Sequence, residues 1–181
     1  MENEIVLKIY DPTNTFIVNK IIDLSKTLFY YDGLLLQSDI EDFKIVFFNK
    51  RTKGWYYTIG NEPIAFLVYR EVAYKKYSDD TWLYIDYIGT NPKYENQRYA
   101  TNLMEIFIKE NDKTSYLHVI NNTRYTERLV KWYSKFGYLK TGDSKSGRGT
   151  GMIKFSSTCD HTKFWEKHRE KTDDTQGEWC L

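Results

Sequence analysis

The feature that most constrains the fold is a β-rich run followed directly by an amphipathic helix pattern. Even-numbered positions of Thr81–Thr90 would share one face of an extended strand, and Asp86 is the charged member of that face. The apolar residues beyond it recur at helical spacing: Ala100, Leu103, Met104, Phe107 and Ile108. A strand end that leads into a helix start presents free backbone amides and the positive end of a helix dipole, which suits a phosphate group.

Patterns on either side of this junction predict alternating strands and helices. The other expected strands are residues 5–10, 55–59, 64–72, 116–120, 138–141 and 152–155. The expected helices are residues 17–29, a short one starting at Ser38, 97–109 and 129–136, with a further short one around 163–171. The order is therefore strand, two helices, three strands, helix, strand, helix and two strands.

Length and composition limit the classes of function. A chain of 181 residues with 41% hydrophobic and 28% charged residues fits one globular domain, which we place at residues 1–155, followed by a polar extension at 156–181. The net charge of only +1 argues against nucleic-acid binding. No run is long and apolar enough for a transmembrane helix, and the first residues do not resemble a signal peptide.

The two cysteines and three histidines offer no sign of a disulfide framework, a metal site or a nucleophile motif. Cys159 and Cys180 provide neither a disulfide framework nor zinc-site spacing, so we expect no metal and a reducing, cytoplasmic location. His118, His161 and His168 have no partner at a known motif spacing, and we interpret all three as structural or surface residues.

Three segments carry a resemblance to a known family. Residues 84–94 hold a strand and a proline-containing turn, residues 95–104 hold a loop and an apolar helix start, and residues 132–138 read Trp-Tyr-Ser-Lys-Phe-Gly-Tyr. In these segments, and over roughly residues 59–138, the chain resembles the GNAT N-acetyltransferase superfamily. The resemblance implies an α/β (α+β) fold with a mixed, mostly antiparallel central sheet flanked by helices, and acetyl-CoA as co-substrate.

The resemblance also implies where acetyl-CoA is held. The positions that it assigns to the co-substrate are Ile88, Gly89, Thr90, Glu95, Asn96, Gln97, Arg98, Tyr99, Ala100, Thr101 and Thr126. The family signature there is Arg/Gln-x-x-Gly-x-Gly/Ala, so Glu95 and Arg98 depart from it while Ala100 conforms. The Arg98 side chain either limits the approach of the pyrophosphate or turns toward a phosphate. Thr126 stands where many relatives carry an Asn.

Two residues are expected to carry the chemistry. Asp86 is the candidate base that takes the proton of the attacking amine, with an exposed or edge-strand carboxylate as the alternative. Attack of the amine on the acetyl group forms a tetrahedral oxyanion and then releases the CoA thiolate. The resemblance implies that the backbone amide of Ile88 stabilises the oxyanion and that the Tyr133 hydroxyl protonates the thiolate. The alternative for Tyr133 is a core aromatic, because it also belongs to the apolar stripe of its helix.

Several alternatives stay open at this stage. A catalytically weak or inactive acyl-CoA-binding protein and an aromatic-rich interaction module compete with the enzyme. The amine acceptor, a small molecule or a protein, would be selected by residues 30–39 and 143–149, which show no recognisable acceptor motif. The oligomeric state is equally open, with a homodimer among the possibilities.

Overall fold

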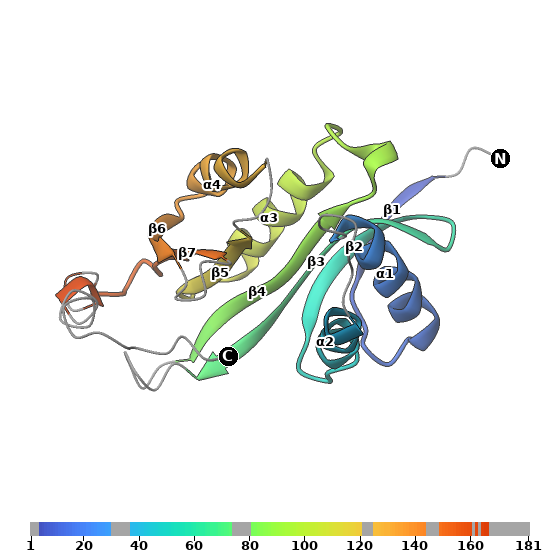
Figure 1. The fold of residues 1–181 in the computed structure, drawn as a ribbon, viewed down its shortest axis with the longest axis horizontal. Helices are drawn as coiled ribbons and strands as arrows, with labels where there is room; N and C mark the ends of the chain where they lie inside the picture. The colour runs from blue at the N-terminus through green and yellow to red at the C-terminus, as the bar shows by residue number, and fades with distance from the viewer. Residues whose placement is uncertain are drawn as a thin grey trace. The chain divides into compact units, whose positions relative to one another are not determined.

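The structure is a computed structural model that describes residues 4–29, 37–73, 81–120, 125–143, 149–160, 162 and 164–166 (Figure 1). Its strands are β1 (Ile5–Ile9), β2 (Lys53–Ile59), β3 (Glu62–Ala73), β4 (Thr81–Thr90), β5 (Ser115–Ile120), β6 (Leu139–Asp143) and β7 (Gly149–Lys154). Its helices are α1 (Thr15–Leu28), α2 (Gln37–Phe47), the 3-10 helix η1 (Pro92–Tyr94), α3 (Tyr99–Glu110) and α4 (Thr126–Ser134). The expected order of strands and long helices is confirmed, and η1 is an addition.

The strands form one mixed sheet in the hydrogen-bonded order β1-β2-β3-β4-β5-β7-β6. The β1–β2, β2–β3, β5–β7 and β6–β7 pairs are antiparallel, whereas β4 and β5 are parallel. The mostly antiparallel sheet that the family resemblance implied is therefore confirmed.

The chain forms two compact units, and each contains two stretches of sequence. The first unit comprises Met1–Glu71 and Ile85–Asn111, and the second comprises Val72–Tyr84 and Asp112–Leu181. Strand β4 contributes residues to both units. The boundary expected at residue 155 stays a prediction.

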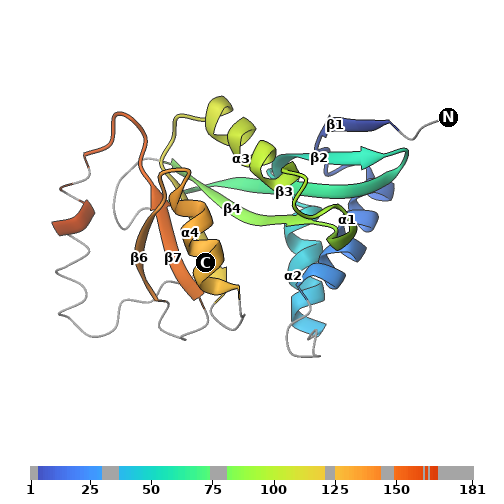
Figure 2. The same ribbon diagram turned by 90° about the horizontal axis from the view of Figure 1, so that it is seen from above.

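In the first unit, helices cover both faces of β2 and β3. Phe66 and Val68 of β3 belong to a buried cluster with α1 and α2, in which Phe47 is fully buried. Tyr69 points to the other face, where its ring meets that of Phe107 on α3 at 5.0 Å. The alternation of side chains along β3 thus places α1 and α2 on one face and α3 on the opposite one (Figure 2).

The second unit has its own aromatic core. Trp82 of β4 lies 5.9 Å from Phe164 between ring centroids, and Phe155 lies 5.2 Å from Phe164. Phe164 is buried although it belongs to the segment that the sequence marks as a polar extension. The beginning of that segment therefore contributes to the core of this unit.

Two element boundaries differ from the sequence expectation. Helix α3 begins at Tyr99 rather than at residue 97, because Arg98 has a left-handed backbone conformation with φ of 67°. Strand β7 begins at Gly149, three residues before the apolar run that predicted it, since its first residues pair with β5 through backbone groups. In the described part of the chain, no helix has the length and apolarity needed to cross a membrane.

Candidate active site

The turn after β4 is built by short-range hydrogen bonds. The Asn91 side chain accepts a hydrogen bond from the Lys93 amide at 3.0 Å and so caps η1, whose first residue is Pro92. The Glu95 amide donates to the Pro92 carbonyl at 3.4 Å. The chain then passes through residues 95–98 to the start of α3.

This loop contains two residues in the left-handed region. Asn96 has φ of 63° and Arg98 has φ of 67°, and they are the only non-glycine residues with positive φ in the described part of the chain. Asn tolerates this conformation better than most residues, whereas Arg has no such preference. Arg98 is also the residue that replaces the first glycine of the signature. The backbone has therefore kept the conformation that a glycine would favour, although the side chain has changed.

The start of α3 is suited to an anion. Arg98 provides no side-chain cap, and no acidic residue occupies the first helical turn. The first hydrogen bond of the helix runs from the Asn102 amide to the Arg98 carbonyl. The amides of Tyr99, Ala100 and Thr101 come before it, so no carbonyl one turn earlier in the helix can accept from them. Helix α1 differs, since the Asn14 side chain caps it.

A second polar group at this junction also lacks a partner. The Thr90 hydroxyl oxygen is buried and has no hydrogen-bond partner among the described residues. A buried hydroxyl without a partner is costly, and a bound polar ligand can supply the missing bond. The end of β4 and the start of α3 thus both fit a phosphate- and amide-bearing ligand such as acetyl-CoA.

The side chains of the loop are largely directed elsewhere. The Arg98 guanidinium donates to Glu105 at 3.3 Å, and both side chains are exposed. The Tyr99 ring lies 5.0 Å from that of Tyr57 on β2, and its hydroxyl donates to Gln97 at 3.5 Å. A phosphate contact by Arg98 therefore stays a prediction.

Gly89 lies where α1 approaches β4 closely. A Cβ atom at Gly89 would lie 2.5 Å from Cδ1 of Leu28 and 3.4 Å from the ring of Phe66. The missing side chain is thus explained by packing against α1. Its neighbour Ile88, assigned to the oxyanion, is partly buried in the same strand.

Asp86 forms a bidentate ion pair with Arg70 of β3. Nε of Arg70 donates to one carboxylate oxygen at 2.9 Å and Nη2 donates to the other at 2.5 Å. The Asp86 side chain is only 3% exposed. Burial raises the pKa of the Asp86 carboxyl above its ordinary value, while the hydrogen bonds and charge of Arg70 act in the opposite direction. The alternative of an exposed or edge-strand carboxylate is therefore wrong: Asp86 is buried, and β4 lies between β3 and β5 inside the sheet.

Tyr87, the residue after Asp86, packs its ring against helix α2. Its ring stacks on Phe47 with centroids 5.4 Å apart and meets Phe43 edge-on at 5.2 Å. Burial raises the pKa of the Tyr87 hydroxyl, and the nearby carboxylates of Asp86 and Asp42 raise it further. The nearby Arg70 guanidinium acts on the pKa of this hydroxyl in the opposite direction. The segment expected to select the acceptor, residues 30–39, lies mostly outside the described residues.

Two predicted site residues lie in the second unit. Tyr133 of α4 is buried, with its ring 4.8 Å from Trp132 and 6.0 Å from Tyr138. Thr126 is the first residue of α4, and its hydroxyl donates to the Ile120 carbonyl at 2.8 Å. Most of the other acceptor segment, residues 143–149, falls outside the described residues.

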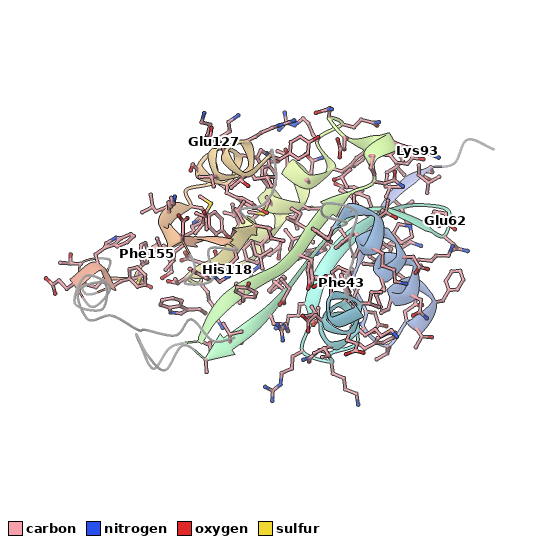
Figure 3. All side chains as sticks on the ribbon, in the orientation of Figure 1. Phe43, Glu62, Lys93, His118, Glu127 and Phe155 are labelled. Atoms are coloured by element: carbon pink, nitrogen blue, oxygen red, sulfur yellow. The ribbon has the colours of Figure 1, made fainter. Side chains whose placement is uncertain are left out.

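The second unit also contains a cluster that the sequence interpretation missed. His118 of β5 (labelled in Figure 3) is bonded through Nδ1 to the Tyr84 hydroxyl at 3.1 Å and through Nε2 to the Tyr116 hydroxyl at 3.3 Å. Burial lowers the pKa of His118 and so favours the neutral ring. A neutral imidazole donates through one nitrogen and accepts through the other. One tyrosine hydroxyl therefore donates to the ring and the other accepts from it.

Backbone packing fixes this cluster. A Cβ atom at Gly151 of β7 would lie 2.1 Å from the Tyr116 hydroxyl and 2.6 Å from the Thr141 hydroxyl. The glycine thus leaves the space that the Tyr116 hydroxyl occupies. The one available sequence signal is that Tyr116 and His118, two residues apart in a strand, lie on the same face of it. Their partner Tyr84 is 34 residues from His118, and only the parallel β4–β5 register brings it there.

Comparison with known proteins identifies the family. The family model described as "Acetyltransferase (GNAT) family" matches residues 18–138, which is more than half of the chain. The chain belongs to the GNAT acetyltransferase family. Among curated proteins, none matches the chain.

Solved structures of GNAT acetyltransferases share its fold at low identity. NAA60 of Arabidopsis thaliana, in complex with a bisubstrate analogue, is 17% identical with a TM-score of 0.63, and the match covers 86% of this chain and all of NAA60. The ribosomal-protein-S18-alanine N-acetyltransferase of Escherichia coli is 14% identical with a TM-score of 0.60, covering 87% of this chain and 97% of that enzyme. The PaiA N-acetyltransferase of Thermoplasma acidophilum, in complex with coenzyme A, is 14% identical with a TM-score of 0.57, covering 84% and 99%.

Acetyl-CoA is the co-substrate of the GNAT family, and NAA60 has also been solved with acetyl-CoA bound. In this chain, the part of the junction that fits such a ligand runs from Thr90 to Thr101. Its fit rests on the uncapped start of α3 and on the unsatisfied Thr90 hydroxyl. Within the described residues, no three His, Cys, Asp or Glu side chains converge as the ligands of a metal ion would.

Proposed function

We propose that the protein is an acetyl-CoA-dependent N-acetyltransferase that acts on a primary amine. The observation that carries the proposal is the start of α3, where an uncapped helix follows a loop that keeps the glycine-like conformation of the family signature at Arg98. Backbone amides in this position bind phosphate groups without help from side chains. The altered signature is therefore compatible with acetyl-CoA binding.

Specific groups would hold acetyl-CoA at this junction. The first amides of α3, those of Tyr99, Ala100 and Thr101, would bind the pyrophosphate, and the Thr90 hydroxyl would gain a partner in the ligand. The backbone of Ile88 and Gly89 would run along the pantetheine arm, with the Ile88 amide donating to the oxyanion. Residues 95–98 would enclose the phosphates, and Thr126 is the further contact that the family resemblance suggests.

The reaction itself needs two proton transfers. The amine nitrogen forms a bond to the acetyl carbon, the carbon–sulfur bond breaks, the amine loses a proton and the CoA thiolate gains one. We assign the thiolate proton to the Tyr133 hydroxyl, whose buried position at the end of α4 supports an ordered donor.

The amine proton has two candidate acceptors. Asp86 is the first, and its burial favours proton uptake, but both of its oxygens already accept hydrogen bonds from Arg70. His118 is the second, because burial favours its neutral form and both of its bonding partners are hydroxyls. If His118 takes up a proton, the hydroxyls of Tyr84 and Tyr116 can rotate and both accept from the imidazolium.

Kinetics of two variants separate these candidates. If His118 is the base, His118→Gln lowers kcat by about 10²-fold or more, and the acidic limb of the pH–rate profile disappears. If Asp86 is the base, Asp86→Asn produces that loss instead. Melting temperatures of both variants must be measured alongside, since each change also removes a hydrogen-bonded partner.

The proposed activity is tested by binding and by turnover. Acetyl-CoA and CoA should raise the melting temperature, because a ligand that binds only the folded state stabilises it, whereas short nucleic acids should not. A rise with nucleic acid alone would overturn the proposal in favour of an interaction module. A rise with acetyl-CoA but no turnover on any amine would favour an inactive acyl-CoA-binding protein.

The amine panel should include proteins and small molecules. The similar solved structures include an enzyme named for the alanine of ribosomal protein S18 and an aminoglycoside 6'-N-acetyltransferase. Peptides with free N-termini, lysine peptides, polyamines and aminoglycosides therefore form the first set. Release of CoA thiol, read with a thiol reagent, measures turnover on each.

A further inference from the structure

Strand β1 is an edge strand with an unusual surface. It pairs with β2 on one side, and no other described strand pairs with its second side. Apolar side chains project from it into solvent: Ile5, Val6 and Leu7 are each about 40% exposed and Ile9 is 79% exposed. Exposed apolar edge strands are templates for pairing with another chain, and proteins usually protect them.

The hydrogen-bonding pattern shows which backbone groups of β1 are available. The Tyr10 amide donates to the Gly54 carbonyl at 2.9 Å, in line with the β1–β2 register in which Val6 lies opposite Thr58. Because the pattern alternates in antiparallel pairs, even-numbered residues direct their N–H and C=O groups to β2. The N–H and C=O groups of Ile5 and Leu7 therefore point to the open side.

The sequence of this edge is complementary to itself. Residues 4–8 read Glu-Ile-Val-Leu-Lys, with an acidic residue at one end, a basic residue at the other and three apolar residues between them. If a second copy runs antiparallel with Val6 opposite Val6, then Glu4 lies opposite Lys8 and Ile5 lies opposite Leu7. Both charged side chains are exposed, so they are free to meet across such a pair.

The backbone pattern fits the same register. Ile5 and Leu7 would form the hydrogen-bonded pairs, which is what their outward-pointing groups require. Glu4 and Lys8 would form non-hydrogen-bonded pairs, in which side chains come closest. The backbone direction requires odd-numbered residues to lie opposite each other, and among the registers that meet this condition the one centred on Val6 also places Glu4 opposite Lys8.

We propose that β1 is the interface of a homodimer, in which the β1 strands of two copies pair antiparallel about a twofold axis at Val6. Each copy presents the same surface to the other, as a twofold interface requires. A five-residue strand buries little area compared with the roughly 1,600 Å² of a standard interface. The dimer is therefore weak and depends on protein concentration.

Charge exchange tests this register. Glu4→Lys places a second ammonium group opposite Lys8 of the partner subunit at two symmetric positions, and Lys8→Glu does the converse with two carboxylates. We expect each single variant to raise the dimer dissociation constant about tenfold in sedimentation equilibrium. The double variant Glu4→Lys/Lys8→Glu restores opposite charges and should return the dissociation constant to near the wild-type value. Both side chains are exposed, so the fold should tolerate all three variants.

Cross-linking tests the position of the twofold axis. In a background with Cys159 and Cys180 replaced by Ser, Val6→Cys should form an intermolecular disulfide on oxidation, because residues opposite each other in a non-hydrogen-bonded pair have Cα atoms about 4.5 Å apart. Ile9→Cys is the matched control, since two copies of residue 9 are six positions out of register and should not cross-link, and this exposed residue lies outside the proposed charge pairs. A protein that stays monomeric at high concentration, a dimer indifferent to the charge exchange, or equal cross-linking of both variants would overturn the proposal. None of these outcomes depends on acetyltransferase activity.

Discussion

Arg98 has a backbone conformation that glycine would adopt with less strain. Its φ of 67° puts the Cβ atom too close to the following carbonyl oxygen, which costs about 1–2 kcal/mol in an L-residue. Its ion pair with Glu105 offsets little of this cost, because both side chains are exposed. The loop thus carries local strain at the position where acetyl-CoA is proposed to bind.

Replacing Arg98 separates strain from side-chain chemistry. Arg98→Ala keeps the strained conformation, whereas Arg98→Gly relieves it. We expect the Gly variant to exceed the Ala variant in unfolding free energy by about 0.5–1 kcal/mol, after the greater flexibility of the unfolded Gly chain is allowed for. Urea denaturation measures the difference, and Glu105→Ala serves as the control for the ion pair. Equal stabilities of the Gly and Ala variants would show that the left-handed conformation is not strained.

The pH dependence of stability tests the environment of Asp86. A carboxyl whose pKa is raised on folding binds more protons in the folded state, so its contribution to stability decreases as pH rises above its ordinary value of 3.8. The unfolding free energy of the wild type minus that of Asp86→Asn should therefore fall as pH rises from below 3.8 toward neutrality. Urea denaturation across this range measures it. A difference that rises with pH would mean that Arg70 outweighs burial.

Tyr133→Phe tests the proposed proton donor. The change removes one hydroxyl and keeps the ring between Trp132 and Tyr138, so we expect turnover to fall about 10²-fold with acetyl-CoA affinity nearly unchanged. Steady-state kinetics and calorimetry measure the two quantities. Tyr125→Phe is a matched control at the start of the same helix, because Tyr125 is exposed. Reduced stability with full turnover would assign Tyr133 to the core alone.

The β5–β7 pair makes an element-scale prediction. Gly151→Ala places a methyl group 2.1 Å from the Tyr116 hydroxyl, so the ring must move and its bond to His118 is lost. We expect a destabilisation of about 1–3 kcal/mol, the usual range for overpacking. Adding Tyr116→Phe removes the clashing oxygen and should recover part of the loss. Thermal unfolding of the single and double variants measures this coupling, and additive losses would contradict it.

Side-chain periodicity predicted most elements, and its failures have physical reasons. Helix α3 was recognised from its apolar stripe, but its start depended on the backbone angle of Arg98, which periodicity does not encode. The strand predicted for β7 was too short at its start, because glycines such as Gly149 pair through the backbone and add nothing to an apolar pattern. Element type followed from local sequence, while element ends followed from backbone conformation and pairing.

The elements of the candidate site were predictable to the extent that they are contiguous in sequence. The β4–α3 junction could be located because residues 84–104 carry it within one stretch. The Arg70–Asp86 ion pair and the Tyr84–His118 bond could not, because each joins residues on different strands and depends on strand register. Sequence alone identified Asp86 as unusual, and only the fold supplied its partner.

At the scale of the whole molecule, each compact unit is assembled from two separated stretches of chain. The match to the family model begins in α1 and ends at Tyr138, so it draws on both units. The mutations considered above can therefore be assigned to units, with Arg98 and Asp86 in the first and Tyr133 and Gly151 in the second. We expect the stability effects of distant pairs across these groups to add.

The interleaving of the two units also has a consequence for synthesis on the ribosome. The first unit has all of its residues once Asn111 has been added, but the second still needs β7, which ends at Lys154. At about 5–20 residues per second, residues 112–154 take roughly 2–9 s to translate. During that interval the buried aromatic cluster of Trp82 and Tyr84 still lacks Ile153, Phe155 and Phe164, which are translated last. A nascent chain paused before β7 should therefore recruit chaperones that the full-length chain does not.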